Sequence, residues 1–567
     1  MLKEFVKKNY RRFHFSLSVN LLFLLFFATV FYCQFETNDD YAMKMIASGA
    51  FGSPDSHLIY INSFIGYILK TFYTLTPHIP WYEVFQFLLI LISLSAVMYV
   101  LINRESNNLY LILLLMTVFL SAHSLYTTLQ FTRTASILAI AGYLLLDDSI
   151  RKRRKIGIAS SIVLIIFSSM IRQNQFLVMS LLCTTVFLPM LYDFVKDWKN
   201  ETKKGDVLRL ILSGAICLLL FVCANLFHKA DYQGEEWDYF NEFNGLRAAV
   251  LDRQEMVYEE NPEFYQKLGL SKTDFDMLAA WNNDDPDVFN VELFRAMYDS
   301  REELAKQDSL IVVIKALIFD SIDFFFGHTS EYFFTFLFFF VFSFFIFSKQ
   351  DKKNILFVWI SILVMAFCIL YCYFYRNRFY MSRTHISILL CGIFIILYRT
   401  KIEKQKLKFL PVFVTVLLLC LSLSGTWFGE FRVNSSMKDK DLKKISALKE
   451  IRADGDHMYF KSTDENLDFV HGLFLDSNSY ACVNMEGLGG WTTNIPMKLD
   501  HLAAYGFRNI FKELVDNEKA YLIINDEERL QTILDYVIIH YNKDAKIKLV
   551  KTIEANKPYG VYQIVSR

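Results

Sequence analysis

The chain has 567 residues, of which 54% are hydrophobic and only 21% charged, with 59 basic and 59 acidic residues. Soluble globular proteins are rarely so apolar, and the apolar residues here form blocks of about 20 with few charges, the length that crosses a bilayer. The composition therefore excludes a soluble enzyme, a fibrous protein and a disordered protein. It predicts a polytopic, all-α membrane protein.

Basic clusters indicate how the spans are oriented. Short loops rich in Lys and Arg stay in the cytoplasm, so the chain should cross the membrane an even number of times between consecutive clusters. The clusters occupy residues 3–12, 151–155, 196–204, 349–353 and 399–408. This rule predicts a cytoplasmic N-terminus and a C-terminus on the outer side.

The apolar runs predict about 11 spans. The first, Phe15–Cys33, is too long for a signal peptide and lacks a small-residue cleavage site. The run 156–195 should break at Arg172, because an Arg at the bilayer centre costs at least about 2.5–3.5 kcal/mol. The other spans are expected at Trp81–Ile102, twice within 109–146 around an outer turn near His123 to Arg133, and at 207–227, 331–347, 355–375, 385–398 and 409–427.

Three outer segments are long enough to carry function. Residues 34–79 and 229–330 form loops of a membrane domain that spans 1–429, and 430–567 form a soluble extracytoplasmic domain. Within the second loop, 229–310 hold 20 acidic and 8 basic residues and show helical signals such as a capping box at Ser271. In the tail, β-like runs alternate with helical patterns, which predicts a small α/β or α+β domain.

Two polar runs in these outer segments are expected to be turns. Asn282 to Asp287 is rich in carboxylates but lacks the spacing and the glycine of an EF-hand, so we interpret it as a turn between helices. Gly487 to Trp491 is glycine-rich and predicts a tight loop, whose Trp could stack on a sugar.

The distribution of charges places any chemistry at the outer surface. No ionisable residue lies near the middle of an expected span, whereas ion-coupled transporters place carboxylates, His or Lys there. The sequence contains no nucleotide-binding glycine motif and no zincin motif, and nothing indicates a nucleic-acid partner. Five arginines lie instead at the outer ends of spans: Arg133, Arg172, Arg376, Arg378 and Arg383.

The most suggestive short sequence is Glu36-Thr37-Asn38-Asp39-Asp40-Tyr41, just after the first span. Two adjacent carboxylates at a membrane surface can supply a general base or bind a divalent cation. They can equally cap a helix, because Asp and Asn favour its N-terminus and carboxylates favour its dipole. The nearby span and the facing arginines favour a functional site.

Together these features resemble the GT-C superfamily of membrane glycosyltransferases, which use polyprenyl-phosphate-linked sugars outside the cytoplasm. The resemblance rests on many spans, an acidic motif in the first outer loop and a soluble C-terminal domain. Bacterial aminoarabinose-transferase and protein-mannosyltransferase relatives carry Asp-Glu, whereas this chain has Asp39-Asp40 followed by Tyr41. The resemblance implies a bacterial cell-membrane enzyme that transfers a sugar to an envelope glycan, lipid or protein.

The expected chemistry assigns roles to these residues. A sugar linked to a lipid phosphate needs one carboxylate to take the acceptor's proton and cations to bind the leaving phosphate. Arg suits the second task because its planar group binds phosphate oxygens in a bidentate way. We expect Asp39 as the base, with Asp40 sharing that role or binding a divalent ion. Lipid-phosphate binding falls to Arg172, Arg376, Arg378 and Arg383, while Arg133, His57 and Arg247 are further candidates for contacts with substrate.

Other functions remain open at this point. An Arg at a span end can pair with lipid headgroups. A polysaccharide polymerase or ligase would also act on lipid-linked glycans, and a flippase or a non-catalytic scaffold needs no base. Placement discriminates between them, because a transferase needs Asp39 or Asp40 within a few ångströms of the arginines.

Overall fold

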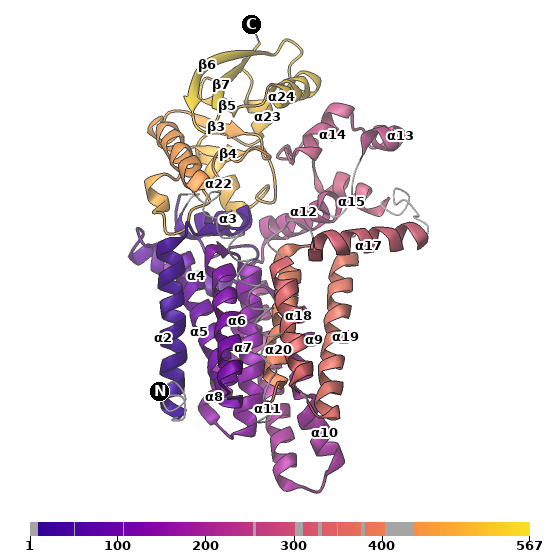
Figure 1. The fold of residues 1–567 in the computed structure, drawn as a ribbon. Helices are drawn as coiled ribbons and strands as arrows, with labels where there is room; N and C mark the ends of the chain where they lie inside the picture. The colour runs from indigo at the N-terminus through magenta and orange to yellow at the C-terminus, as the bar shows by residue number, and fades with distance from the viewer. Residues whose placement is uncertain are drawn as a thin grey trace.

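The computed structural model shows a helical bundle with a mixed α/β domain on one end (Figure 1). The structure describes residues 9–49, 52–105, 107–252, 257–300, 310–326, 332–348, 350–375, 380–402 and 435–566.

The bundle is built from long apolar helices that run roughly side by side (Figure 1). In chain order they are α2 (Asn9–Val30), α5 (Trp81–Arg104), α6 (Asn108–Thr127), α7 (Phe131–Arg151), α8 (Lys155–Ile171), α9 (Gln173–Cys183), α10 (Leu188–Lys196), α11 (Glu201–Asp231), α18 (Tyr332–Phe347), α19 (Lys352–Tyr375) and α20 (Ser382–Arg399).

Seven helices in the described ranges are long and apolar enough to cross a membrane. They are Arg12–Val30, Trp81–Arg104, Asn108–Thr127, Gln173–Lys196, Glu201–Asp231, Lys352–Tyr375 and Ser382–Arg399, and two shorter apolar helices cover Lys155–Ile171 and Phe333–Phe347. These helices indicate a protein embedded in a membrane. The helix break expected at Arg172 is confirmed, while the expected span 409–427 lies outside the described residues.

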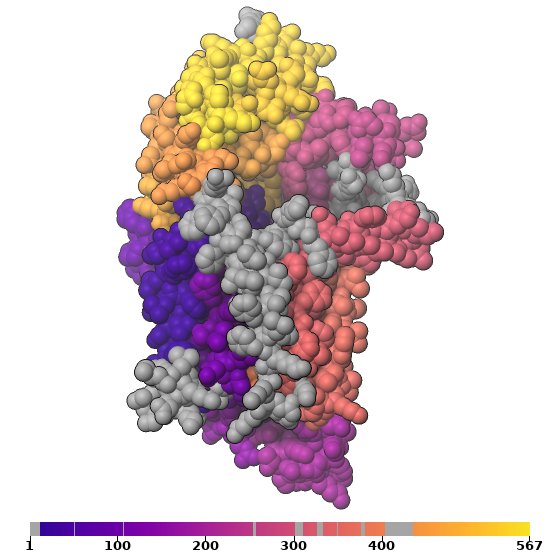
Figure 2. Space-filling model, viewed as in Figure 1, coloured from indigo at the N-terminus to yellow at the C-terminus, as the bar shows by residue number. Residues whose placement is uncertain are grey.

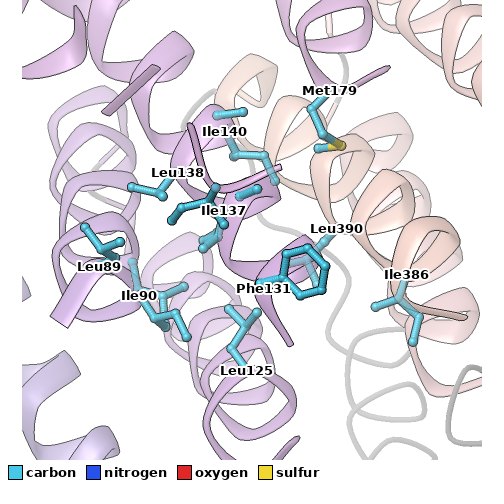
Figure 3. Close-up of a cluster of buried hydrophobic side chains, with 14 of the residues drawn as sticks. Leu89, Ile90, Leu125, Phe131, Ile137, Leu138, Ile140, Met179, Ile386 and Leu390 are labelled. Atoms are coloured by element: carbon cyan, nitrogen blue, oxygen red, sulfur yellow. The ribbon is translucent and has the colours of Figure 1, made fainter. Parts of the chain in front are cut away.

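Helix α7 forms the centre of the bundle. It packs against α5, α8, α9 and α20, and nearly all of its side chains are buried. Leu138 and Ile140 of α7 lie among side chains of these neighbours, such as Ile90, Met179 and Leu390 (Figure 3). Because other helices surround it, α7 can carry more small and polar residues than a lipid-facing span.

Short helices between β1 (Gln34–Phe35) and the second long helix form the first loop. They are α3 (Asn38–Ser48) and α4 (Ser63–Leu75). The second loop is also helical, as expected, and contains α12 (Glu235–Leu251), α13 (Pro262–Lys267), α14 (Lys272–Ala279) and α15 (Val291–Asp299). The expected capping box is confirmed, with Ser271 and Asp274 each accepting from the other's backbone N–H.

Helix α17 (Leu310–Phe326) runs across the end of the bundle rather than along it (Figure 1). Apolar side chains such as Leu310, Ile318 and Phe319 are exposed along it. On its other face, Asp320 accepts a hydrogen bond from the Tyr373 hydroxyl at 2.6 Å. We did not predict a helix at these residues.

The C-terminal domain has a five-stranded mixed sheet with the strand order β4-β3-β5-β7-β6. Strands β4, β3 and β5 are parallel, and β7 pairs antiparallel with both β5 and β6. The elements are a helix at 435–453, β3 (Met458–Lys461), β4 (Met485–Gly487), α22 (Pro496–Ala504), α23 (Ile510–Glu513), β5 (Ala520–Ile524), α24 (Glu527–His540), β6 (Lys546–Glu554) and β7 (Pro558–Val565). The expected small mixed domain is therefore confirmed.

The second loop and the C-terminal domain lie side by side over one end of the bundle and share a hydrophobic core (Figure 2). The acidic turn between α14 and α15 supplies the polar part of this contact. Asp284 pairs with buried Lys498 at 2.7 Å, and Asp285 accepts hydrogen bonds from the hydroxyls of Tyr536 and Tyr541 at 2.6 and 2.8 Å. The carboxylates of this expected turn therefore attach the loop to the domain.

Candidate active site at the domain-side end of the bundle

The segment that precedes α3 is fixed by backbone pairing. β1 pairs with β2 (Thr128–Leu129), the turn between α6 and α7. On its other side, Phe35 N–H donates to the His471 carbonyl at 2.8 Å and Leu473 N–H to the Cys33 carbonyl at 2.9 Å. The chain from the first span is thus held between the bundle and the C-terminal domain, which sets the position of α3.

Helix α3 begins at Asn38, with Thr37 at the N-cap position. Asp39 and Asp40 therefore lie inside the first turn, and the alternative that one of them occupies the cap position is wrong. Both carboxylates still lie near the positive end of the helix dipole. Adjacent residues on a helix point about 100° apart, so the two side chains have different surroundings.

Asp40 points into the protein and is fully buried. Its Oδ1 accepts hydrogen bonds from the Tyr82 hydroxyl at 2.8 Å, from Gln86 Nε2 at 3.1 Å and from the Phe131 N–H at 3.1 Å. Burial raises the pKa of Asp40 to about 8, although these hydrogen bonds favour the charged form. Asp40 therefore joins α3 to α5 and to the start of α7.

A buried ion pair holds the next turn of α3. Lys44 Nζ lies 2.7 Å from Glu83 Oε1, and neither side chain is exposed. The same ammonium donates to the Leu475 carbonyl of the C-terminal domain at 3.1 Å. Removing one partner of such a pair would leave a buried charge uncompensated, so the pair fixes α3 against α5 and the domain.

Asp39 points toward the arginines instead. Its side chain is 20% exposed, and its Oδ2 lies 3.7 Å from Arg383 Nη1 at the start of α20. The distance required for a transferase site is therefore present. A pair at this distance beside solvent is weakly held, so both groups are available to a ligand.

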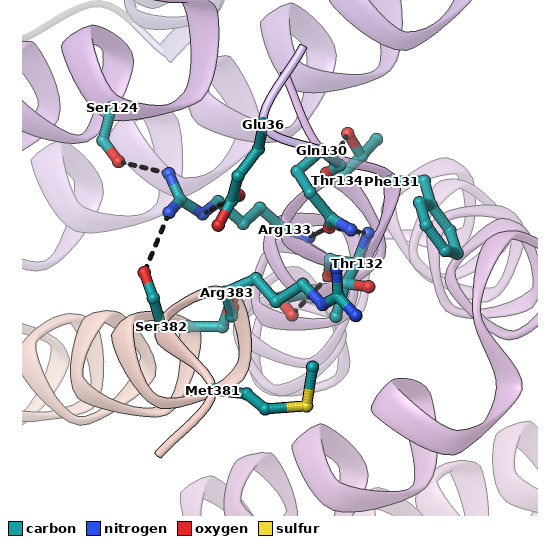
Figure 4. A network of polar contacts seen from close by, with 12 residues as sticks. Glu36, Ser124, Gln130, Phe131, Thr132, Arg133, Thr134, Met381, Ser382 and Arg383 are labelled. Carbon is teal, nitrogen blue, oxygen red and sulfur yellow. Dashed lines mark hydrogen bonds and ion pairs between the residues drawn. The ribbon is translucent and has the colours of Figure 1, made fainter. Parts of the chain in front are cut away.

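A second arginine lies in the same network (Figure 4). Arg133 Nε lies 3.1 Å from Glu36 Oε2, and the guanidinium donates to the hydroxyls of Ser124 at 3.2 Å and of Ser382 at 3.4 Å. Ser382 immediately precedes Arg383, so Arg133 connects α6, α7 and α20. Glu36 is a site residue that we did not assign from the sequence, and its place beside the acidic pair is the only signal for it.

Arg383 lines a cavity of about 220 Å³ between α9, α19 and α20. Arg172, at the break between α8 and α9, lines the same cavity, as do His385, Tyr371 and Tyr375. The Arg172 guanidinium lies over the rings of Tyr60 and Phe131, 5.0 and 5.1 Å from their centroids. Two expected phosphate-binding arginines from distant parts of the chain thus meet at one cavity.

Of the remaining candidates, two cannot be placed and His57 lies in another cluster. Arg376 and Arg378 lie outside the described residues. His57 Nδ1 lies 2.7 Å from Asp55 Oδ1, and its Nε2 lies 3.4 Å from Asp231 Oδ2. Burial lowers the pKa of His57, but the Asp55 hydrogen bond and the two carboxylate charges outweigh it, so the pKa is raised. This cluster connects the first loop to α11.

Arg247 is 1% exposed and bonds within its own loop. Its Nη1 lies 3.2 Å from Asp252 Oδ1, and its Nε and Nη2 donate to Asn244 Oδ1 at 3.1 and 3.0 Å. The guanidinium also lies over the Trp281 ring at 5.1 Å. The contacts of Arg247 organise the second loop.

The acidic pair does not fit a shared divalent cation. A metal ion needs several oxygen ligands directed at one point, whereas Asp39 and Asp40 point in different directions and Asp40 is surrounded by hydrogen-bond donors. Across the described ranges, no group of three or more His, Cys, Asp or Glu side chains could hold a metal ion.

No family model, curated protein or solved structure matches this chain in comparisons with known proteins.

Proposed function

We propose that this protein is a GT-C-type glycosyltransferase that moves a sugar from a polyprenyl-phosphate donor to an envelope acceptor. The observation that carries this proposal is the position of Asp39. Its carboxylate is partly exposed and lies 3.7 Å from Arg383, which lines a cavity together with Arg172. A base, two cations and a cavity are the groups that such a transfer needs.

The reaction forms one bond and breaks one. The acceptor hydroxyl oxygen attacks C1 of the sugar, its proton moves to the Asp39 carboxylate, and the C1–O bond to the lipid phosphate breaks. The electron pair of that bond stays on the phosphate oxygen. Arg383 and Arg172 stabilise this developing charge, which exceeds that of the bound donor, so their contacts favour the transition state. Arg133 holds Ser382 and hence the start of α20.

The placement of the cavity suits a lipid-linked donor. Its lining includes Leu177 and Tyr371, which are also exposed on the apolar outer faces of α9 and α19. A donor in the bilayer can therefore present its phosphate to Arg383 while its polyprenyl chain stays in lipid.

The orientation is part of the proposal. Basic residues such as Arg151 and Lys155 lie at the end of the bundle that is far from the C-terminal domain. The positive-inside rule places that end in the cytoplasm. We propose about 11 spans in a bacterial cell membrane, with the site and the C-terminal domain outside.

The test compares Asp39→Asn with Asp40→Asn. A strain that lacks the gene is complemented with wild type or with either variant, and envelope sugars are analysed after membrane levels of each protein are matched. Loss of a general base slows transfer by about 100-fold to 10,000-fold. We therefore expect one sugar to disappear in the deletion, to return with wild type and Asp40→Asn, and to stay absent with Asp39→Asn.

Asp40→Asn is a matched control because it makes the same chemical change one residue away. Its amide oxygen can keep the contacts of Oδ1 with Tyr82, Gln86 and Phe131. Full rescue by Asp39→Asn would contradict the mechanism. An unchanged sugar composition in the deletion strain would instead favour a scaffold.

A further inference from the structure

A second cavity, of about 180 Å³, lies between α3 and the C-terminal domain. From α3 it is lined by Asn38, Tyr41 and Met45, which lie on one face of the helix at the spacing of successive turns. The domain contributes charged and aromatic side chains to the opposite wall. None of the residues that line this second cavity also lines the cavity of Arg172 and Arg383.

Asp39 connects the two cavities along the chain. It follows Asn38, which lines the second cavity, and its carboxylate lies 3.7 Å from Arg383, which lines the first. The cavities are also joined by aromatic rings, because Trp491 of the second lies 5.0 Å from Tyr60, whose ring contacts Arg172. A base beside two binding sites can take a proton from a group bound in one site while that group attacks a molecule bound in the other site.

The walls of the second cavity carry groups suited to hydroxyls. Lys461 Nζ lies 3.1 Å from Asp468 Oδ1, and Glu486 lies 3.9 Å from Lys498. The Thr463 hydroxyl is buried and has no hydrogen-bond partner among the described residues. A buried hydroxyl gains free energy from a hydrogen-bond partner, so this group can bind a ligand hydroxyl that enters the cavity.

The charge of these walls limits the ligand. Lys461 is already paired with Asp468, and Glu486 adds a further carboxyl group, so the wall offers no unpaired cation to an anionic polymer. Carboxylates accept hydrogen bonds from hydroxyls, amides such as that of Asn38 both accept from and donate to them, and a Trp ring stacks on the apolar face of a sugar.

We infer that the cavity between α3 and the C-terminal domain binds a neutral glycan, which is the acceptor of the transfer. Trp491 stacks on one sugar ring, and Asn38, Glu486 and Thr463 bind its hydroxyls. One hydroxyl projects past Asn38 to the Asp39 carboxylate. The identification as acceptor rests on the proposed transferase function, whereas glycan binding does not.

The test measures binding to the full-length Asp39→Asn protein, which holds ligands without turnover. The probes are chitotetraose, maltotetraose and mannotetraose as neutral glycans, polyglycerol phosphate as an anionic polymer, and a serine-containing peptide. We expect at least one neutral glycan to bind with a millimolar or lower Kd, and the other two classes not to bind.

Variants locate the site. Trp491→Ala should weaken glycan binding by about tenfold or more, as expected from the loss of a stacking aromatic, while Trp491→Phe keeps most of it. Trp198→Ala is the matched control, because Trp198 is exposed beyond α10, at the far end of the bundle. Thermal unfolding of each variant shows that the fold is retained.

Four outcomes overturn the inference: no neutral glycan binds, binding is unchanged in Trp491→Ala, the anionic polymer binds in its place, or the peptide does. A kinetic measurement separates this result from the proposed function. In membranes that contain the protein with Asp39 intact, Trp491→Ala should raise the KM for the acceptor and leave the KM for the donor unchanged. Binding without any transfer would contradict the transferase and leave the glycan site standing. Transfer with an unchanged acceptor KM would support the transferase and contradict the glycan site.

Discussion

The two ends of the bundle both bury charged side chains, but they do so in different ways. At the domain-side end, Asp39 and Arg383 are partly exposed, 3.7 Å apart and beside a cavity. At the other end, Asp147 is fully buried and lies 2.9 Å from Arg151 Nε, and it also accepts a hydrogen bond from the Tyr398 hydroxyl.

The difference shows how position determines what a charge can do. A short, buried, hydrogen-bonded pair stabilises the fold, because separating its partners would leave charges in a poor solvent. A longer pair beside a cavity stabilises little and can exchange its partner for a ligand. The first arrangement is therefore expected to affect stability and the second activity.

The first effect concerns stability at the end of the bundle far from the C-terminal domain. Asp147→Ala leaves Arg151 and the buried Tyr398 hydroxyl without their shared acceptor, while the Arg151 side chain is 28% exposed and can reach water. Leaving a buried donor without its acceptor costs about 1–3 kcal/mol. The free energy of unfolding in detergent should fall by that amount. Transfer per folded molecule should stay unchanged.

Glu201→Ala is the matched control for this change. Glu201 pairs with Lys204 at 2.8 Å but its side chain is 84% exposed, so its loss should hardly alter stability. Equal stabilities of the two variants would show that the Asp147 network does not support the bundle.

The next effect concerns activity. Arg383→Gln removes a cation from the phosphate site, and loss of one such contact slows a reaction by about 100-fold to 1000-fold. We expect transfer to fall by that factor and the KM for the donor to rise, with thermal unfolding nearly unchanged. Arg399→Gln, which changes the buried arginine at the other end, should instead lower the temperature of thermal unfolding and leave transfer per folded molecule unchanged. If both variants lose activity equally, the contrast between the ends is wrong.

The last effect concerns pH. Burial raises the pKa of Asp40 from its ordinary value of 3.8 to about 8, so the folded protein holds a proton between these values that the unfolded chain has released. The contribution of Asp40 to stability is therefore fully present below pH 3.8 and is lost as the pH rises through 8. In Asp40→Asn this part of the pH dependence should vanish, and unfolding measured across that range should show a flatter profile. Parallel profiles for the variant and wild type would contradict the shifted pKa.

Local patterns in the sequence predicted much of the bundle and of the C-terminal domain. Hydrophobic length placed the long helices, and the cost of a central Arg predicted the break at Arg172. The β-like runs at 521–524 and 561–565 predicted strands there, and the structure confirms them as β5 and β7. These features depend on neighbouring residues, so a sequence can reveal them.

Contacts between distant segments were not predictable in the same way. The sequence could not show that Asp40 is buried while Asp39 is partly exposed, because this depends on Tyr82 and Phe131, which come from other helices. The two-residue strand β1 is too short to show a periodicity. The docking of Asp284 on Lys498 joins residues that are 214 positions apart. We expected Asp39 to lie near the arginines only because a transferase would require it, and no spacing in the sequence predicted the contact with Arg383.

The orientation of α17 affects the depth of the candidate active site relative to the bilayer. A helix that lies flat at the boundary of the bilayer resists displacement in both directions, because rising exposes Ile318 and Phe319 to water while sinking takes Lys315 and Asp323 into hydrocarbon. Its contact with Tyr373 passes this constraint to α19, whose Tyr371 and Tyr375 line the cavity of Arg383. In the proposed orientation, bilayer thickness should therefore tune the proposed sugar transfer, since α17 would set the depth at which a lipid's phosphate meets the protein.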